Sequence, residues 1–250
     1  LFQGDGTDQT QITGFTIRNC QAPWYDWNGN GNADYWEYFG GGAWSRQGAG
    51  VTMQSCRFVD NVAEYGGGIC NFDEFGSQNN PTLIDCHFQN NTAGTGVGGG
   101  IYSASSSPTL TDCSFVGNSA AYGGGMLNWD GSDAILTNCT FESNTASSGG
   151  GGVYTDSSEP TMTYCTFRTN FAVDGGGVFN ADPSSSQNIP SFNRCTFSGN
   201  HAASEGGGMH NFSVSPVIED CQFSNNTAAT GGGILSWNSS NPRISSTPFC

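Results

Sequence analysis

Hydrophobic and polar positions along this chain follow one pattern that occurs seven times. Each copy reads Cys-x-Phe-x-x-Asn-x-Ala, and a run of glycines followed by one aliphatic residue comes after it. Successive copies begin 26 to 30 residues apart, and a unit of this length is too small to bury its own apolar face. Such a period is typical of a solenoid, in which each unit stacks on its neighbours. The copies begin at Cys56, Cys86, Cys113, Cys139, Cys165, Cys195 and Cys221.

Each repeat predicts short strands and turns, because it lacks the apolar spacing of a helix and is rich in Val, Ile, Thr, Phe, Asn and Gly. Cys86 and Phe88 are two residues apart and share one face of a strand, whereas Leu83 breaks this alternation and indicates a bend. The aliphatic column that precedes the cysteines comprises Ile17, Met53, Leu83, Leu110, Leu136, Met162, Phe192, Ile218 and Ile244. The column that follows the glycines comprises Ala43, Ile69, Ile101, Met126, Val153, Val178, Met209 and Ile234.

These columns predict an all-β fold: one right-handed parallel β-helix domain over residues 1–250, with about eight to nine coils of 26–30 residues. Hydrophobic residues make up only 35% of the chain, but like residues stacked in columns form a thin, continuous core. The chain has 38 glycines, and the runs among them fall at one corner of each coil. We expect the backbone there to need positive φ or a close approach to the next coil.

Two polar columns are interpreted as structural. The asparagines are expected to form an internal ladder, in which each amide bonds to the next at a tight corner in the left-handed conformation. The cysteines are expected to be buried, unreactive thiols, with Cys20 in the same column as the seven motif cysteines. Disulfides between coils stay open as an alternative, and Cys70 and Cys250, off the column, could bridge within or between molecules. The asparagines are Asn61, Asn91, Asn118, Asn144, Asn170, Asn200 and Asn226.

An insertion at about residues 21–39 matches the twelve-residue calcium loop. Oxygen-bearing side chains fill positions 1, 3, 5 and 9, Gly31 fills position 6, and Glu37 fills position 12. Ca²⁺ takes six to eight oxygen ligands, and glycine permits the sharp turn that points alternate residues inward. The alternative is an Asn-Gly loop without an ion. The predicted calcium ligands are Asp26, Asn28, Asn30, Asn32 (through its carbonyl), Asp34 and Glu37.

A stripe of aromatic residues is predicted on the outer face of the strand that follows the glycines. If the first residue of that strand points inward, the second and fourth point outward. Contiguous outward aromatics indicate a docking surface for another protein or for sugar rings, or a face covered by the loops before each proline. The predicted partner-binding residues are Trp44, Phe72, Tyr102, Trp129, Tyr154, Phe179, Phe212 and Trp237.

Catalysis is the less favoured hypothesis. Some parallel β-helices degrade polysaccharides, but here lysine is absent, and the six arginines and three histidines are scattered over different columns. Asp85, Asp112 and Asp220 form an outward column that could hold a hydrolytic pair. Repetition with the coil period instead favours a solvated or weakly cation-binding face.

The Phe-x-x-Asn and Gly-Gly-x-Ile elements of the repeat resemble those of chlamydial polymorphic outer membrane proteins. They are also similar to bacterial surface proteins described as right-handed β-helix repeat proteins. The resemblance covers roughly residues 12 to 249 and implies a β-helix with an adhesive or structural role. A cysteine before every motif phenylalanine is more regular than that pattern requires.

The charge and the ends of the chain restrict its partners and its location. The formal net charge is −15 without any lysine, which excludes nucleic acid and anionic membrane surfaces as partners. The chain starts within a coil and lacks a signal peptide, so we expect a piece of a longer or processed extracellular protein. Phe249 occupies the Phe column of a ninth coil, so the open strand edges at that end are expected to be covered. Either further sequence continues the stack, or another subunit covers the end by end-to-end assembly into a fibre.

We therefore predict an extracellular, cell-surface structural or adhesive module that is stabilised by Ca²⁺ and is not a catalyst. A carbohydrate-binding or polysaccharide-degrading β-helix is the alternative. A partner protein, self-association or a glycan would be the binding partner.

Overall fold

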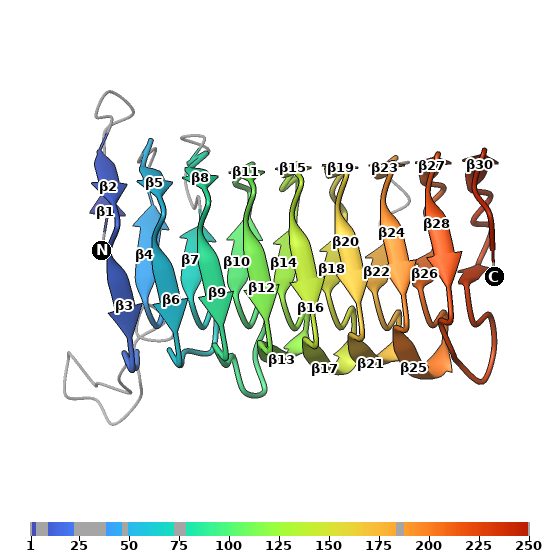
Figure 1. Ribbon diagram of the computed structural model, residues 1–250, viewed down its shortest axis with the longest axis horizontal. Helices are drawn as coiled ribbons and strands as arrows, with labels where there is room; N and C mark the ends of the chain where they lie inside the picture. Colours follow the sequence, from blue (N-terminus) through green and yellow to red (C-terminus); the bar gives the residue numbers. More distant parts are fainter. Residues whose placement is uncertain are drawn as a thin grey trace.

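The computed structural model describes residues 2–3, 10–22, 39–46, 50–72, 79–183 and 188–249. Short parallel strands in these ranges stack into four sheets along one long axis (Figure 1). Each full coil passes in turn through sheets B, C and A, whose strands are given below, and four coils add a strand of sheet D between C and A, which confirms the predicted parallel β-helix.

Sheets A and B contain nine strands each. Sheet A comprises β1 (Phe2–Gln3), β4 (Ala43–Arg46), β7 (Ile69–Phe72), β10 (Ile101–Ala104), β14 (Met126–Trp129), β18 (Val153–Asp156), β22 (Val178–Ala181), β26 (Met209–Phe212) and β29 (Ile234–Trp237). Sheet B comprises β2 (Gln11–Thr13), β5 (Thr52–Gln54), β8 (Thr82–Ile84), β11 (Thr109–Thr111), β15 (Ile135–Thr137), β19 (Thr161–Thr163), β23 (Ser191–Asn193), β27 (Val217–Glu219) and β30 (Arg243–Ser245).

Sheets C and D contain eight and four strands. Sheet C comprises β3 (Thr16–Arg18), β6 (Arg57–Val59), β9 (His87–Gln89), β12 (Ser114–Val116), β16 (Thr140–Glu142), β20 (Thr166–Arg168), β24 (Thr196–Ser198) and β28 (Gln222–Ser224). Sheet D comprises β13 (Ser119–Tyr122), β17 (Thr145–Gly149), β21 (Phe171–Asp174) and β25 (His201–Glu205).

The repeated phenylalanines stack one above another in the core. Phe88 and Phe115 have ring centroids 4.7 Å apart, and Phe115 and Phe141 have centroids 4.5 Å apart. The rings within each pair are nearly parallel, at 5° and 6°. The two predicted aliphatic columns pack against this stack from sheets A and B, so the predicted core is confirmed.

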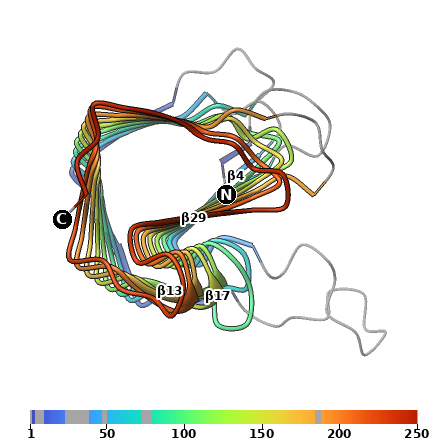
Figure 2. The same ribbon diagram turned by 90° about the vertical axis from the view of Figure 1, so that its right-hand side faces the viewer.

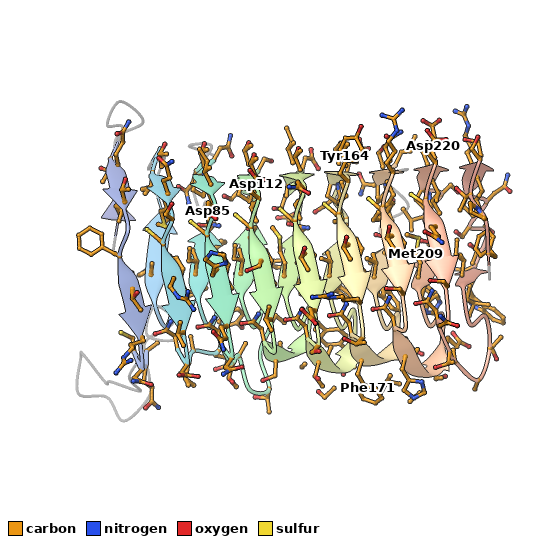
Figure 3. All side chains as sticks on the ribbon, viewed as in Figure 1. Asp85, Asp112, Tyr164, Phe171, Met209 and Asp220 are labelled. Carbon is orange, nitrogen blue, oxygen red and sulfur yellow. The ribbon has the colours of Figure 1, made fainter. Side chains whose placement is uncertain are left out.

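The bend predicted before each cysteine is a single residue in the left-handed region. Asp85, Asp112 and Asp220 have φ of 51°, 54° and 52°, and they lie along one edge of the molecule (Figure 3). Asp and Asn tolerate this conformation better than most residues, so the aspartate column is explained by the backbone. The side chains bond laterally: Ser55 donates to Asp85 over 2.9 Å, and Asn138 donates to Asp112 over 2.5 Å.

The asparagine ladder is confirmed. The Oδ1 atom of Asn144 accepts bonds of 3.0 Å from both the backbone N–H and the Nδ2 atom of Asn118. Its Nδ2 atom donates to the Phe115 carbonyl and to Asn170 Oδ1, again over 3.0 Å. The expected left-handed backbone is one residue earlier than predicted, for example at Ser143, because the turn precedes the inward-pointing amide.

The glycine corner is also confirmed. The first glycine of each run has positive φ, as at Gly123 with 64°. The second glycine needs space instead: a Cβ atom on Gly124 would lie 2.5 Å from the Gly151 carbonyl oxygen of the next coil. This corner therefore lets the chain reverse tightly between sheets D and A.

The assignment of the first coil was wrong by one column. Ile17 pairs with Phe58 and so lies in the Phe column, whereas Ile12, which pairs with Met53, occupies the predicted aliphatic column. Cys20 accordingly lies in the Asn column, and its backbone N–H donates to Asn61 Oδ1 over 3.0 Å. Sheets B and C are separated by the same number of residues as in later coils, but Phe15 stands where later coils have the cysteine, so alignment on Cys20 misplaced this coil.

The motif cysteines are buried free thiols, as predicted. Cys113 Sγ lies 3.4 Å from the Thr111 carbonyl oxygen and 3.5 Å from that of Leu83. Cys70 is also a free thiol with no exposed surface, so the suggested bridge from Cys70 is wrong. Burial raises the pKa of the Cys70 thiol well above its ordinary value. Cys250 lies outside the described residues.

A second buried polar column was not predicted. The third residue of each sheet A strand points inward, and these residues are polar and fully buried from Ser45 to Asn211. Asn180 Nδ2, for example, donates to Asn211 Oδ1 over 2.9 Å. The inner face of sheet A is therefore apolar at its first position and polar at its third.

Viewed along the axis, the coil is not a simple closed loop (Figure 2). After sheet D the chain runs inward to the glycines and turns back there, and sheet A then runs outward beside sheet D. The outer face of sheet A therefore faces sheet D across a groove, and this arrangement positions the candidate site.

Candidate functional site

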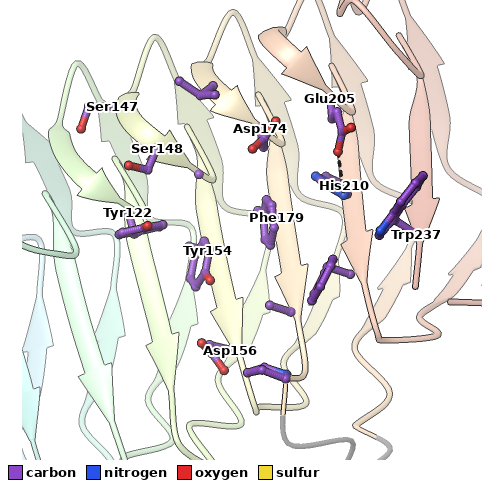
Figure 4. A pocket seen from close by; sticks show the side chains of 15 residues that line it. Tyr122, Ser147, Ser148, Tyr154, Asp156, Asp174, Phe179, Glu205, His210 and Trp237 are labelled. Atoms are coloured by element: carbon purple, nitrogen blue, oxygen red, sulfur yellow. Dashed lines mark ion pairs between the residues drawn. The ribbon is translucent and has the colours of Figure 1, made fainter. Parts of the chain in front are cut away.

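A groove runs along the axis between the outer face of sheet A and the C-terminal ends of the sheet D strands (Figure 4). It contains two hollows of about 670 Å³ and about 370 Å³. Tyr122, Tyr154 and Asp156 line both hollows, so the groove is continuous across several coils. A volume of this size is within the range of ligand sites in proteins.

The N-terminal end of the groove is filled by the protein's own side chains. Cys70, Tyr102 and Leu127, at the second position of their strands, are at most 5% exposed. They pack in a cluster with Phe39 and Tyr65, the residues that precede the glycine runs. Among the described residues, the cover therefore comes from the segment before the glycines; residues 73–78 of the loop before Pro81 lie outside the described part of the chain.

The predicted partner-binding residues divide accordingly. Trp44 and Phe72 pack against this filled end, and Tyr102 is buried within it. Trp129 and Trp237 are 45% and 61% exposed at the open part. Six of the eight line the two hollows: Tyr102, Trp129, Tyr154, Phe179, Phe212 and Trp237.

Aromatic rings in the open groove are spaced by the coil repeat. Tyr122 and Tyr154 have centroids 5.1 Å apart, and Tyr154 and Phe179 have the same separation. Phe179 and His210 follow at 4.6 Å. The fold thus presents about one ring per coil in a row along the axis.

Acidic residues replace uncharged ones towards the C-terminal end. The residue before the glycines is Phe39, Tyr65, Val97, Tyr122 or Gly149 in earlier coils, but it is Asp174 on β21 and Glu205 on β25. Opposite them, His210 Nε2 lies 3.6 Å from Glu205 Oε2 (Figure 4). One ligand atom from each of Asp174, Glu205 and His210 lies within 4.8 Å of the other two.

Burial governs the ionisation of these groups. His210 is 4% exposed, and burial lowers its pKa although the charges of Glu205 and Asp174 act in the opposite direction. The imidazole is therefore favoured in its neutral form. Burial likewise raises the pKa of Tyr154, with a further contribution from the charge of Asp156. Burial also raises the pKa of Asp156 itself.

The family model described as "Right handed beta helix region" matches residues 2–141 and 98–213. The chain belongs to the right-handed β-helix family. A second model, the Chlamydia polymorphic membrane protein repeat, matches residues 220–236 of this β-helix. Comparison with curated proteins gives no match.

The β-helix places the acidic groove residues where sequence reasoning did not look. Asp174 and Glu205 were missed, and His210 was noted only as an isolated histidine in the outward column. A signal was present, because the column immediately before the glycines changes from uncharged to acidic at these two coils. Reading that column together with the outward column of sheet A would have found the group.

The predicted calcium ligands lie outside the described residues. Asp26, Asn28, Asn30, Asn32, Asp34 and Glu37 all fall within 23–38, so the calcium loop stays a prediction. The described chain does fix both ends of this segment, because Gln21 bridges to Val62 and Phe39 bridges to Tyr65 in the next coil. Among the described residues, no helix is long and apolar enough to cross a membrane.

Proposed function

We propose that this β-helix is an adhesive module of the cell surface whose groove binds an extended, neutral glycan without cleaving it. The row of aromatic rings in the open groove carries the proposal. An aromatic face packs well against the C–H face of a pyranose ring, and Trp129 and Trp237, which are 45% and 61% exposed, line the two hollows. Asp156, Ser147 and Ser148 line the larger hollow and can bond to sugar hydroxyls.

The shape of the groove favours a chain over a flat protein surface. Side chains from sheets A and D face each other across it, so an occupant must enter between two walls. An added peptide strand would need a free sheet edge, but β14, β18, β22 and β26 are each paired on both sides. A ligand that binds by ring stacking and hydroxyl groups meets these conditions.

Charge supports a neutral ligand. Asp156, Asp174 and Glu205 all line the larger hollow, and the whole chain has a net charge of −15 without lysine. These carboxylates would repel a polyuronate, and the described groove residues include no cation other than a titratable histidine. Neutral sugars instead donate hydroxyl bonds to carboxylates.

Location and stability belong to the same proposal. The short match to the Chlamydia polymorphic membrane protein repeat supports a place at the cell surface. A calcium ion in the 26–37 loop would suit extracellular calcium, because three carboxylates give modest affinity. We propose that this ion stabilises the first coils, distant in sequence from the open groove.

Isothermal titration calorimetry with cello-, xylo-, manno- and malto-oligosaccharides tests the proposal. We expect one neutral series to bind and polygalacturonate to fail. Trp129→Ala and Trp237→Ala should each weaken binding roughly tenfold, the equivalent of about 1.4 kcal/mol. Phe171→Ala is the matched control, because Phe171 is also an exposed aromatic residue but does not line the groove (Figure 3).

Two results would overturn the proposal. If Phe171→Ala weakens binding as much as the tryptophan variants do, the groove is not the site. If chromatography shows that the bound oligosaccharide is shortened, and Glu205→Gln abolishes this shortening, the module is a hydrolase.

A further inference from the structure

Three potential metal ligands converge at one place in the groove. Asp174 and Glu205 are the last residues of β21 and β25, and they are partners in the register of sheet D. His210 is the second residue of β26, and the glycine corner that begins at Gly206 turns the chain back so that it faces Glu205. Two sheets therefore contribute to one cluster.

His210 is buried without a suitable partner. Its side chain is 5% exposed, and neither ring nitrogen has a hydrogen-bond partner among the described residues. The same is true of Asp174 Oδ1. Buried polar atoms without partners are costly and rare, so a group that leaves three such atoms together requires an explanation.

The columns around the cluster strengthen this argument. The partner of Glu205 on one side is Asp174, so two carboxylates lie next to each other in adjacent coils. Apolar residues at the equivalent positions of earlier coils, Tyr65 and Val97, pack without such repulsion. Adjacent carboxylates repel each other unless a proton or a cation lies between them.

We propose that Asp174, Glu205 and His210 bind a divalent transition-metal ion, with Zn²⁺ as the best fit. Zn²⁺ accepts imidazole nitrogen and carboxylate oxygen together, whereas Ca²⁺ and Mg²⁺ prefer oxygen ligands alone. Three protein ligands leave one position of a tetrahedral ion open, and all three residues line the larger hollow. The neutral imidazole favoured by burial is the form that binds a metal.

This site is separate from the calcium loop and does not depend on glycan binding. The calcium prediction uses residues 26–37, whereas the three ligands proposed here lie between 174 and 210. It also differs from the column of Asp85 and Asp112, whose side chains bond to Ser55 and Asn138.

The test is titration of the purified chain with ZnCl₂, with CaCl₂ and MgCl₂ as comparisons. The protein is first treated with a chelator and dialysed. We expect a Zn²⁺ site that is lost in His210→Phe, in Glu205→Gln and in Asp174→Asn. His210→Phe should fold, because Phe179 occupies the neighbouring position of the same column. His87→Gln is the matched control, since His87 also lies 3.7 Å from a carboxylate, that of Asp85, but is exposed.

Co²⁺ substitution provides a second readout. Nitrogen and oxygen ligands should give visible d–d absorption without the near-ultraviolet thiolate band that cysteine ligands produce. Zn²⁺ should also raise the melting temperature of the native chain and of His87→Gln, but not that of His210→Phe. The proposal is overturned if Zn²⁺ fails to bind, if His210→Phe binds it equally well, or if a thiolate band appears.

Discussion

At the scale of single residues, the column decides what a side chain does. Phe141 is fully buried in the stacked core, whereas Phe171, on sheet D of the next coil, is 39% exposed. Asn144 is buried in the ladder, whereas Asn138 is exposed at a left-handed bend and donates to Asp112. Residue type therefore predicts little here until the position within the coil is known.

The ladder gives a sharp prediction. Asn144→Ala removes an acceptor from two Asn118 donors and a donor from the Phe115 carbonyl. Buried groups left without partners cost roughly 1–3 kcal/mol each, so we expect the free energy of unfolding to fall by about 3 kcal/mol. Urea denaturation followed by circular dichroism measures it.

Asn193→Ala is the control for that variant. Asn193 is only partly buried on sheet B, and a substitution at such a position should change stability by less than about 0.5 kcal/mol. If both variants lose the same free energy of unfolding, the loss in Asn144→Ala does not come from the asparagine ladder.

At the scale of elements, strands of three to five residues are held in place by their corners. A strand as short as β12 has little stability of its own. Its position is fixed by the turns at both ends, where the backbone adopts the left-handed conformation before the strand and again at Gly117 after it. The glycine corner then sets how closely sheet A approaches sheet D. The groove exists because of this corner.

A matched pair of glycine substitutions tests this corner. Gly124→Ala places a Cβ atom 2.5 Å from the Gly151 carbonyl oxygen and 2.6 Å from that of Thr145. Both atoms belong to the backbone of the next coil, so neighbouring coils must separate. Gly149→Ala meets only the rings of Tyr154 and Phe179, at 3.3 and 3.4 Å, which can shift within the groove.

We therefore expect Gly124→Ala to lower the free energy of unfolding by about 2 kcal/mol or more, as overpacking does, and Gly149→Ala to lower it by less than about 1 kcal/mol. Equilibrium unfolding in urea compares the two variants. Similar losses would show that the close approach between coils is not what requires glycine at position 124.

Much of this architecture could be predicted from the sequence, because residues at the same position of successive repeats stack on one another in the fold. Phe88, Leu83 and Ile101 could each be placed from spacing alone, as could the bend before Cys86. The groove could not, because the pattern shows which way a side chain points but not what lies opposite. Tyr102, at the second position of β10, is buried against Phe39 and Tyr65, whereas Trp129, at the fourth position of β14, is 45% exposed.

At the scale of the whole molecule, the coils form a one-dimensional array in which each contacts only its neighbours. Stability in such an array is approximately a sum of local terms, and an ion bound at one coil influences chiefly the adjacent coils. The predicted calcium loop lies within the first coil, and the proposed Zn²⁺ site lies towards the C-terminal end. Their effects should therefore be separable along the chain.

Hydrogen exchange measured by mass spectrometry resolves these effects. The 23–38 segment is flanked by Ala22, whose N–H donates to the Val62 carbonyl, and by Gly40, whose N–H donates to the Tyr65 carbonyl. Millimolar Ca²⁺ added to calcium-free protein should slow exchange at Ala22, Gly40 and Val62. Exchange at β27, several coils away, should stay unchanged.

Glu37→Gln removes the twelfth-position carboxylate and should abolish the slowing, because that residue supplies two oxygens to the ion. Slowing spread evenly over all coils, or slowing that persists in Glu37→Gln, would show that Ca²⁺ acts elsewhere than in the 26–37 loop.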